Sequence, residues 1–179
     1  MRFHDALDFL SAQINYERKQ PVGYRRSVGI TALKRFLAYA GSPHKAFPSI
    51  VVGGTNGKGS TATILSNILG SHGLRVGLYT SPHIRCITER VRINGRSISK
   101  QSFAREVTRV KTRLEYFHEI APHHQLTYFE VLTAAAFSFF QRQAVDVCVA
   151  EVGLGGRLDA VNVLDSGLSV ITAVSFDHT

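Results

Sequence analysis

The sequence places a lysine inside a run of glycines, directly after a short apolar segment. The run is VVGGTNGKGST, residues 51–61, in which Lys58 stands between Gly57 and Gly59. Glycines let backbone N–H groups turn towards an anion, and a neighbouring lysine adds positive charge. These residue types favour phosphate binding, and a flexible glycine-rich turn is the alternative.

The run departs from the common phosphate-loop pattern G-x-x-x-x-G-K-[ST] at two positions. Val52 stands where the first glycine belongs, and Gly59 stands where a hydroxyl residue follows the lysine. A strand before the run and a helix beginning near Ser60 nevertheless match the context of such a loop. The residues expected to bind nucleotide are Gly54, Thr55, Asn56, Gly57, Lys58, Gly59 and Ser60.

Three further polar groups follow apolar runs. Glu151 opens EVGLGGRLDAVN, and a carboxylate at a strand end near a triphosphate is a natural magnesium ligand. Ser81 lies in TSPH, and His178 follows Asp177 in SFDHT. The alternatives are a capping role for Glu151, an ordinary turn at Ser81 and a structural histidine at position 178.

The apolar runs that precede these groups predict the strands that position them. SIVV, RVGLY, VCVAEV and SVITAV are continuous rather than alternating, which is typical of buried parallel strands. Ligands of open parallel sheets bind at the carboxyl ends of the strands. We therefore expect Lys58, Ser81, Glu151 and His178 to gather at one edge of a mostly parallel sheet.

Apolar spacing of three and four residues predicts helices between these strands. The first covers residues 4–14, and a later one, within residues 60–73, turns Ile64, Ile68 and Leu69 inward. The segment ERVRINGRSIS predicts a hairpin at its Asn-Gly pair. The other expected helices are residues 30–40, residues 101–120 with Phe103, Val107, Val110, Leu114 and Phe117 buried, and a buried helix within residues 127–143. The fold class is α/β, a phosphate-loop-containing, mostly parallel sheet flanked by helices.

The composition of the chain limits the classes of ligand and partner that we expect it to bind. The 179 residues suggest one domain, and a formal net charge of +8 suggests anionic ligands. The basic residues are scattered and do not alternate with aromatic ones, so we expect no nucleic acid. Asp5 and Asp8 interrupt any leader-like segment, and the longest apolar stretch is about half a membrane span. No membrane partner and a cytoplasmic location follow, and Cys148 should be a buried apolar residue.

Taken together, GTNGKGST, VGLYTSPH, ERVRING, LTYFE, EVGLGGRLDAVN and DHT resemble the motifs of the folylpolyglutamate synthase family, including its bifunctional dihydrofolate synthase form. That family belongs to the Mur ligase superfamily. The resemblance implies an ATP-dependent ligase that adds L-glutamate to dihydropteroate or folates through an acyl phosphate, with Mg²⁺ as cofactor.

The resemblance also assigns roles to residues. It implies catalytic roles for Lys58, Glu151 and His178, and a metal site formed by Ser81, Glu151 and His178. The residues implied in the pterin site are Leu126, Thr127, Tyr128, Phe129, Arg157, Leu158 and Asp159. Without the resemblance, Tyr128 and Phe129 read as core aromatics, with a stacking surface as the alternative.

Members of the family are longer than this sequence. We therefore expect residues 1–179 to be the ATP-binding domain, truncated before a C-terminal glutamate-ligase domain, inactive alone and monomeric when full length. The segment YRRSVGI differs from the stretch that family members often carry at this point. The resemblance therefore implies no pterin contact from this N-terminal loop. Two other hypotheses remain: a phosphate-loop phosphotransferase or NTPase of another class, and a nucleotide-binding fragment without catalysis.

Overall fold

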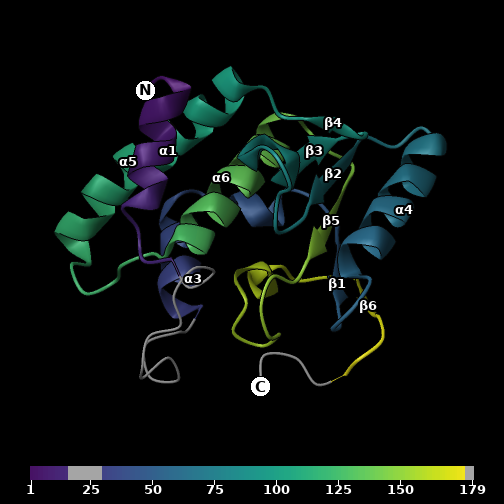
Figure 1. Cartoon of the computed structure of the whole chain (residues 1–179). Helices are drawn as coiled ribbons and strands as arrows, with labels where there is room; N and C mark the ends of the chain where they lie inside the picture. The colour runs from purple at the N-terminus through teal and green to yellow at the C-terminus, as the bar shows by residue number, and fades with distance from the viewer. Residues whose placement is uncertain (16–29, 176–179) are drawn as a thin grey trace.

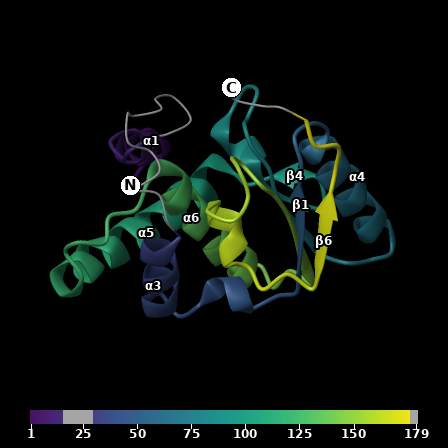
Figure 2. The same ribbon diagram turned by 90° about the horizontal axis from the view of Figure 1, so that it is seen from below.

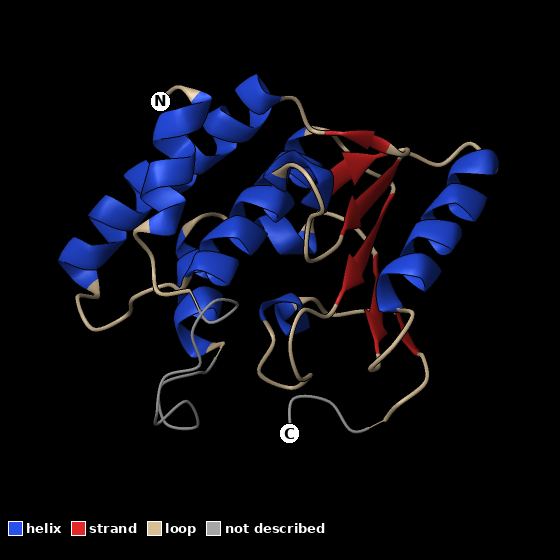
Figure 3. Cartoon of the chain, in the orientation of Figure 1, coloured by secondary structure: helices blue, strands red, loops and turns tan. Residues whose placement is uncertain are grey.

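The computed structural model of the chain describes residues 1–15 and 30–175. A six-stranded sheet lies between helices on both of its faces (Figure 3), which confirms the α/β fold class. The loop expected around residues 20–30 lies almost entirely outside the described residues, and so does His178.

The sheet has the strand order β4-β3-β2-β5-β1-β6. Four adjacent strands run parallel, because β5 pairs with both β2 and β1, and β1 pairs with β6. The remaining two form an antiparallel hairpin against β2. The strands are β1 Ser49–Gly53, β2 Val76–Tyr79, β3 Val91–Ile93, β4 Arg96–Ser97, β5 Val147–Glu151 and β6 Leu168–Ile171.

Helix α4 covers one face of the sheet, and the other long helices gather on the opposite face (Figures 1 and 2). The helices are α1 Phe3–Ser11, α3 Thr31–Tyr39, α4 Lys58–Ser71, α5 Lys100–Ile120 and α6 Tyr128–Arg142. Short 3-10 helices are η1 Pro43–Lys45, η2 Ile87–Arg90 and η3 Ala160–Val163. The sequence order of strand, helix and strand therefore produces a layered molecule, as the pattern predicted.

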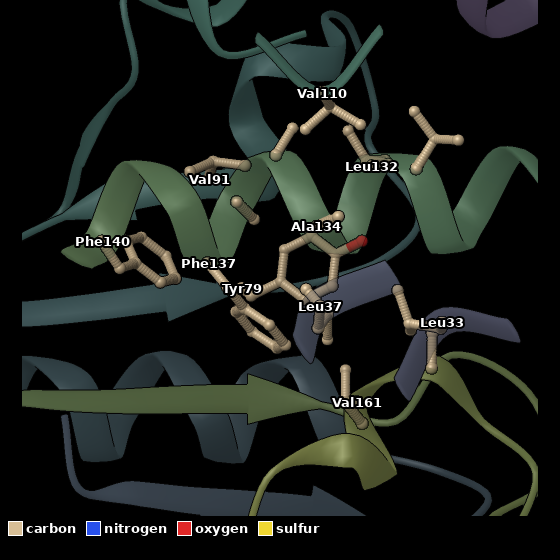
Figure 4. Packing of buried hydrophobic residues seen from close by; sticks show 14 of the residues in the cluster. Leu33, Leu37, Tyr79, Val91, Val110, Leu132, Ala134, Phe137, Phe140 and Val161 are labelled. Atoms are coloured by element: carbon tan, nitrogen blue, oxygen red, sulfur yellow. The ribbon is translucent and has the colours of Figure 1, made fainter. Parts of the chain in front are cut away.

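Two apolar cores follow from this layering. Because successive strand side chains point to opposite faces, Cys148 and Ala150 join the large core under α5 and α6, whereas Val147 and Val149 join the small core under α4. Figure 4 shows the large core, where Tyr79, Phe137 and other residues pack between α6 and the sheet. The predicted buried positions of α5 are confirmed: Phe103, Val107, Val110, Leu114 and Phe117.

The inward face predicted for α4 is wrong at two positions. Ile64 and Ile68 are 60% and 51% exposed, and the helix instead turns the small residues Ala62 and Ser66 to the sheet. These two stand four residues apart on one face, so their size lets the helix approach the strands closely. Leu69 packs partly against the small core, as expected.

Two other expectations also fail, namely the burial of the last strand and the end of the first helix. The last strand, β6, is largely exposed, because it pairs only with β1 and forms an edge of the sheet. Ile14 is exposed because α1 ends at Ser11 rather than residue 14. The hairpin is confirmed: Asn94 and Gly95 have positive φ values of 44° and 76°, as a tight two-residue turn requires.

Across the described ranges 1–15 and 30–175, no helix combines the length and apolar character needed to cross a membrane.

Candidate functional site

The glycine-rich loop joins the end of β1 to the start of α4. Gly54 has a φ of 129°, and a Cβ there would lie 2.1 Å from Oγ1 of Thr172, so only glycine fits. Gly57 has a φ of 80° and forms the N-cap of α4. The helix begins at Lys58, two residues before the expected start at Ser60. This early start places the positive end of the helix dipole within the loop.

The loop is fastened to the segment that follows β6. The backbone N–H groups of Thr55 and Asn56 donate to the carbonyl of Ala173 at 2.9 and 3.4 Å. The Thr55 hydroxyl donates to the carbonyl of Ser175 at 3.1 Å. These contacts join the loop to the chain beyond β6, and they occupy the backbone N–H groups of its first two polar residues.

The side chain of Lys58 folds back over its own loop. Its Nζ donates to the carbonyls of Gly54 and Thr55 at 2.9 and 3.0 Å. Burial raises the pKa values of Glu151 and Asp159, and the positive charge of Lys58 opposes that rise. An incoming anion would therefore meet an ammonium group that is held by neutral carbonyls, which a phosphate oxygen can replace.

Glu151 lies against the first turn of α4. It ends β5 and is 5% exposed, and the backbone N–H of Ser81 donates to its Oε2 at 3.0 Å. A Cβ on Gly59 would stand 3.2 and 3.3 Å from the two carboxylate oxygens. The departure from the phosphate-loop pattern at this position thus has a spatial reason, because a side chain would press on the carboxylate.

Opposing effects act on the Glu151 carboxylate. Burial is the largest and raises its pKa above the ordinary value. The Ser81 N–H, the charge of Lys58, the Gly59 N–H and the charge of Arg90 each lower the pKa. A cation bound at the carboxylate would favour the ionised form that burial disfavours.

The structure therefore brings Lys58, Ser81 and Glu151 to one edge of the sheet, where the expected cluster should lie. His178 falls outside the described residues. Among the described residues no three His, Cys, Asp or Glu side chains converge on one point. One buried carboxylate beside a serine and a phosphate loop nevertheless fits a hard divalent cation such as Mg²⁺, which keeps waters and phosphate oxygens as its other ligands.

The expected pterin residues divide into two groups. Leu126 is buried in the large core, and Thr127 caps α6 by accepting from the backbone N–H of Glu130. Tyr128 is 8% exposed, so most of its ring is core. Phe129 is partly buried and stacks on Tyr79, with 5.8 Å between ring centroids. Phe129 is thus the better placed of the two aromatics to offer a surface to a ligand.

Asp159 shapes the loop after β5. Its Oδ2 accepts from the N–H groups of Gly153 and Leu154 at 3.0 and 2.8 Å, and its Oδ1 accepts from Val161 at 2.9 Å. Burial raises its pKa, and these N–H groups oppose the rise. Both oxygens of the carboxylate accept hydrogen bonds from backbone N–H groups, so the side chain holds the loop in place.

The same loop reaches the aromatic residues of α6. A Cβ on Gly153 would lie 2.9 Å from the ring of Phe129, so glycine permits the close approach. Arg157 and Leu158 are exposed at the tip of the loop. The structure therefore joins Phe129 and the Asp159 loop and leaves the other two side chains pointing away from the core.

Sequence reasoning missed two residues at this edge. Arg90 is 2% exposed, and its Nε donates to Nδ1 of His83 at 2.9 Å. Its guanidinium also lies over the ring of Tyr128, 5.9 Å from the centroid. Both residues lie in motifs that the sequence analysis used, because His83 belongs to TSPH and Arg90 to ERVRING. The Asn-Gly pair of ERVRING indicates a hairpin, however, and does not indicate a role for Arg90.

Comparison with known proteins gives a consistent result, although no family model matches the chain. A probable bifunctional folylpolyglutamate synthase/dihydropteroate synthase of Haloferax volcanii is 40% identical over 179 residues, which is all of this chain and 20% of that protein. A dihydrofolate synthase/folylpolyglutamate synthase of Haemophilus influenzae is 45% identical over 130 residues, which is 73% of this chain and 28% of that protein.

Solved structures agree with the sequence matches. A complex of folylpolyglutamate synthase with AMPPCP and folate has a TM-score of 0.90 and 32% identity, covering all of this chain and 42% of that one. A bifunctional folylpolyglutamate synthase/dihydrofolate synthase with Mn, AMPPNP and L-glutamate bound has a TM-score of 0.85 and 34% identity. The match covers 100% of this chain and 40% of that one.

The chain therefore spans between about a fifth and two fifths of the lengths of these four proteins. Identity above 30% over the whole of this chain, together with TM-scores of 0.90 and 0.85, is more than a likeness of architecture. In sequence and in fold, the chain is therefore a homologue of part of the length of folylpolyglutamate synthase and dihydrofolate synthase proteins.

Proposed function

We propose that this chain is the nucleotide-binding part of an ATP-dependent ligase that joins L-glutamate to dihydropteroate, to folates or to both. The observation that carries the proposal is the position of the Glu151 carboxylate, buried against Gly59 and beside Lys58. A phosphate loop and a carboxylate at adjacent strand ends are the parts that phosphoryl transfer requires.

In this proposal, the loop holds the phosphates of ATP. Lys58 exchanges its bonds to the carbonyls of Gly54 and Thr55 for bonds to phosphate oxygens. The first turn of α4 directs its N–H groups and its dipole towards the same charges. Stabilising the phosphoryl group in this way lowers the barrier to its transfer.

Glu151, Ser81 and His178 would hold Mg²⁺ beside the phosphates. When bound, the ion would neutralise charge on the phosphates and on the substrate carboxylate. The Ser81 N–H fixes the Glu151 carboxylate in place, and Gly59 leaves room for it. The arrangement keeps the metal-binding carboxylate from having to reorganise when the nucleotide arrives.

Chemically, the reaction is transfer of the terminal phosphoryl group of ATP to a carboxylate of the pteroate or folate. The amino group of L-glutamate then attacks the acyl phosphate, an amide bond forms, and inorganic phosphate leaves. Phe129, Tyr128, Leu126 and Thr127, with the loop carrying Arg157, Leu158 and Asp159, would border the pterin end of that substrate. The stacked pair of Phe129 and Tyr79 supports this placement, since a flat heterocycle stacks favourably on aromatic rings.

The ligands bound to solved relatives agree with this assignment. One relative carries AMPPCP and folate, and another carries Mn, AMPPNP and L-glutamate. Residues 1–179 would then form the ATP-binding domain of a full-length enzyme that is monomeric and cytoplasmic. A phosphotransferase of another class, or a nucleotide-binding fragment without catalysis, remains the competing proposal.

The test measures ADP formation and incorporation of labelled glutamate by the full-length protein that carries this sequence. Under the proposal, both require ATP, a divalent metal, dihydropteroate or a folate, and glutamate together. The isolated 179-residue chain should bind AMPPNP without incorporating label. ADP formation that does not depend on pteroate and glutamate would favour the other phosphotransferase class and reject the ligase.

A further inference from the structure

Arg90 lies outside the phosphate loop and the proposed metal ligands, although its charge lowers the pKa of Glu151 against the rise that burial causes. It ends η2 immediately before β3, and its side chain is 2% exposed, the largest of the fully buried side chains. Removing a guanidinium from water costs free energy unless its N–H groups are satisfied and its charge is useful. The surroundings of this side chain therefore indicate what the buried charge does.

One end of the guanidinium is attached to the segment that contains Ser81. Nε of Arg90 donates to Nδ1 of His83 at 2.9 Å, and His83 follows Ser81 by two residues. An imidazole whose Nδ1 accepts a hydrogen bond is fixed in both orientation and tautomer. Arg90 thus holds the loop from which the Ser81 N–H reaches Glu151.

The other side of the guanidinium faces the start of α6. Its central carbon lies 5.9 Å from the centroid of the Tyr128 ring, within the range of a cation–π contact. Tyr128 precedes Phe129, the ring that stacks on Tyr79. One buried side chain therefore contacts both the segment that would serve the metal and the segment that would serve the pterin.

We propose that Arg90 is a positioning residue for the ligation reaction, which holds the Ser81–His83 segment and the start of α6 at a fixed separation. The inference rests on the proposed function. Its consequence is that the phosphates held at Glu151 and the carboxylate of a pterin-anchored substrate meet in the geometry that transfer needs. In this proposal Arg90 acts through its contacts with His83 and Tyr128 rather than by contacting phosphate or substrate.

The experiment uses steady-state kinetics of the full-length protein with ATP, Mg²⁺, dihydropteroate and glutamate. Arg90→Lys keeps the charge but loses the directional Nε–H donor. We expect kcat/KM for dihydropteroate to fall about tenfold or more, as the loss of a hydrogen bond from a charged group implies. AMPPNP binding without dihydropteroate should stay within about twofold, because the loop is untouched.

Arg92→Lys is the matched control. Arg92 is a half-buried arginine on the adjacent strand whose Nε also donates a hydrogen bond, at 2.8 Å, to the carbonyl of Glu89. It lies outside the proposed site, so its replacement should leave kcat/KM within about threefold of the wild type. Equal losses in both variants would assign Arg90 a merely structural role and overturn the proposal.

A second variant keeps the proposal falsifiable if Arg90→Lys fails to fold. His83 is half-buried, so His83→Ala should fold, and it should lower kcat/KM for dihydropteroate in the same direction. Where both variants fold, the double variant should be no worse than the more impaired single one, because the two residues act as one unit. Unchanged kcat/KM in His83→Ala, or losses that multiply in the double variant, would overturn it. A wild-type protein without ligase activity would instead reject the proposed function.

Discussion

The backbone N–H of Ser81 donates a 3.0 Å hydrogen bond to Oε2 of Glu151, which joins the ends of β2 and β5 across the sheet. These strands are direct neighbours in the parallel part of the sheet, so the contact is a product of strand order. It means that a metal ligand proposed from one motif is oriented by the backbone of another.

Replacing Glu151 should remove metal-dependent turnover. In full-length Glu151→Ala, we expect the ligation rate at saturating ATP and Mg²⁺ to fall by about a hundredfold or more, because the buried carboxylate supports the metal. The control is Glu115→Gln, since the Glu115 side chain is 63% exposed on α5. Near-normal ligation by a folded Glu151→Ala protein, judged by circular dichroism, would remove Glu151 from the metal site.

Adding a methyl group at Gly59 should separate activity from stability. The Cβ of Gly59→Ala would stand 3.2 Å from Oε2 of Glu151, so the carboxylate must shift. Helix propensity favours alanine over glycine by about 1 kcal/mol, and this gain opposes the cost of crowding the carboxylate. The melting temperature should therefore change little, whereas metal-dependent turnover should fall. Gly70→Ala, on the same helix with its nearest contact at 4.0 Å, should keep full turnover. Equal turnover in both variants would argue against the crowding.

Phe129 should contribute to pterin binding. In full-length Phe129→Leu, we expect pteroate binding to weaken by about 1 kcal/mol, the value of an aromatic stacking contact, with AMPPNP binding unchanged. The matched control is Phe139→Leu, because Phe139 is also partly buried on α6 but packs near Phe140 instead. Isothermal calorimetry that gives the same pteroate dissociation constant for wild type and Phe129→Leu would return this ring to a purely structural role.

Burial of Glu130 predicts a pH dependence of stability. Burial raises its pKa above the ordinary value of 4.5, against hydrogen bonds from Thr127 that lower it. The folded state therefore holds this proton to higher pH than the unfolded state does. The contribution of Glu130 to the free energy of unfolding consequently falls as the pH rises from about 4.5 through the raised pKa.

The variant Glu130→Gln keeps an oxygen that can serve in the capping box with Thr127 but cannot ionise. Urea unfolding between pH 4.5 and 7 should show a shallower decline of stability in this variant than in the wild type. Glu115→Gln serves again as the exposed control, and its profile should match the wild type. A wild-type slope in Glu130→Gln would show that the carboxyl does not carry the effect.

Local patterns in the sequence determined much of the architecture. Continuous apolar runs fixed β1, β2 and β5, and spacing of three and four residues identified α5 together with its five buried positions. The Asn94–Gly95 pair required the hairpin, because positive φ values are accessible to few residues. Such features depend on neighbours along the chain, which a sequence displays directly.

Tertiary structure decided which faces are buried and which residues meet. Whether Ile64 or Ala62 turns inward depends on how closely α4 approaches the sheet, and the exposure of β6 depends on its place at the edge. The reason that Gly59 replaces a hydroxyl residue lies in Glu151, far away in the sequence. Arg90 joins His83 to Tyr128 only because the fold brings the end of η2 close to both the segment after β2 and the start of α6. These relationships arise from packing between distant segments, and local sequence patterns contain no information on the distances involved.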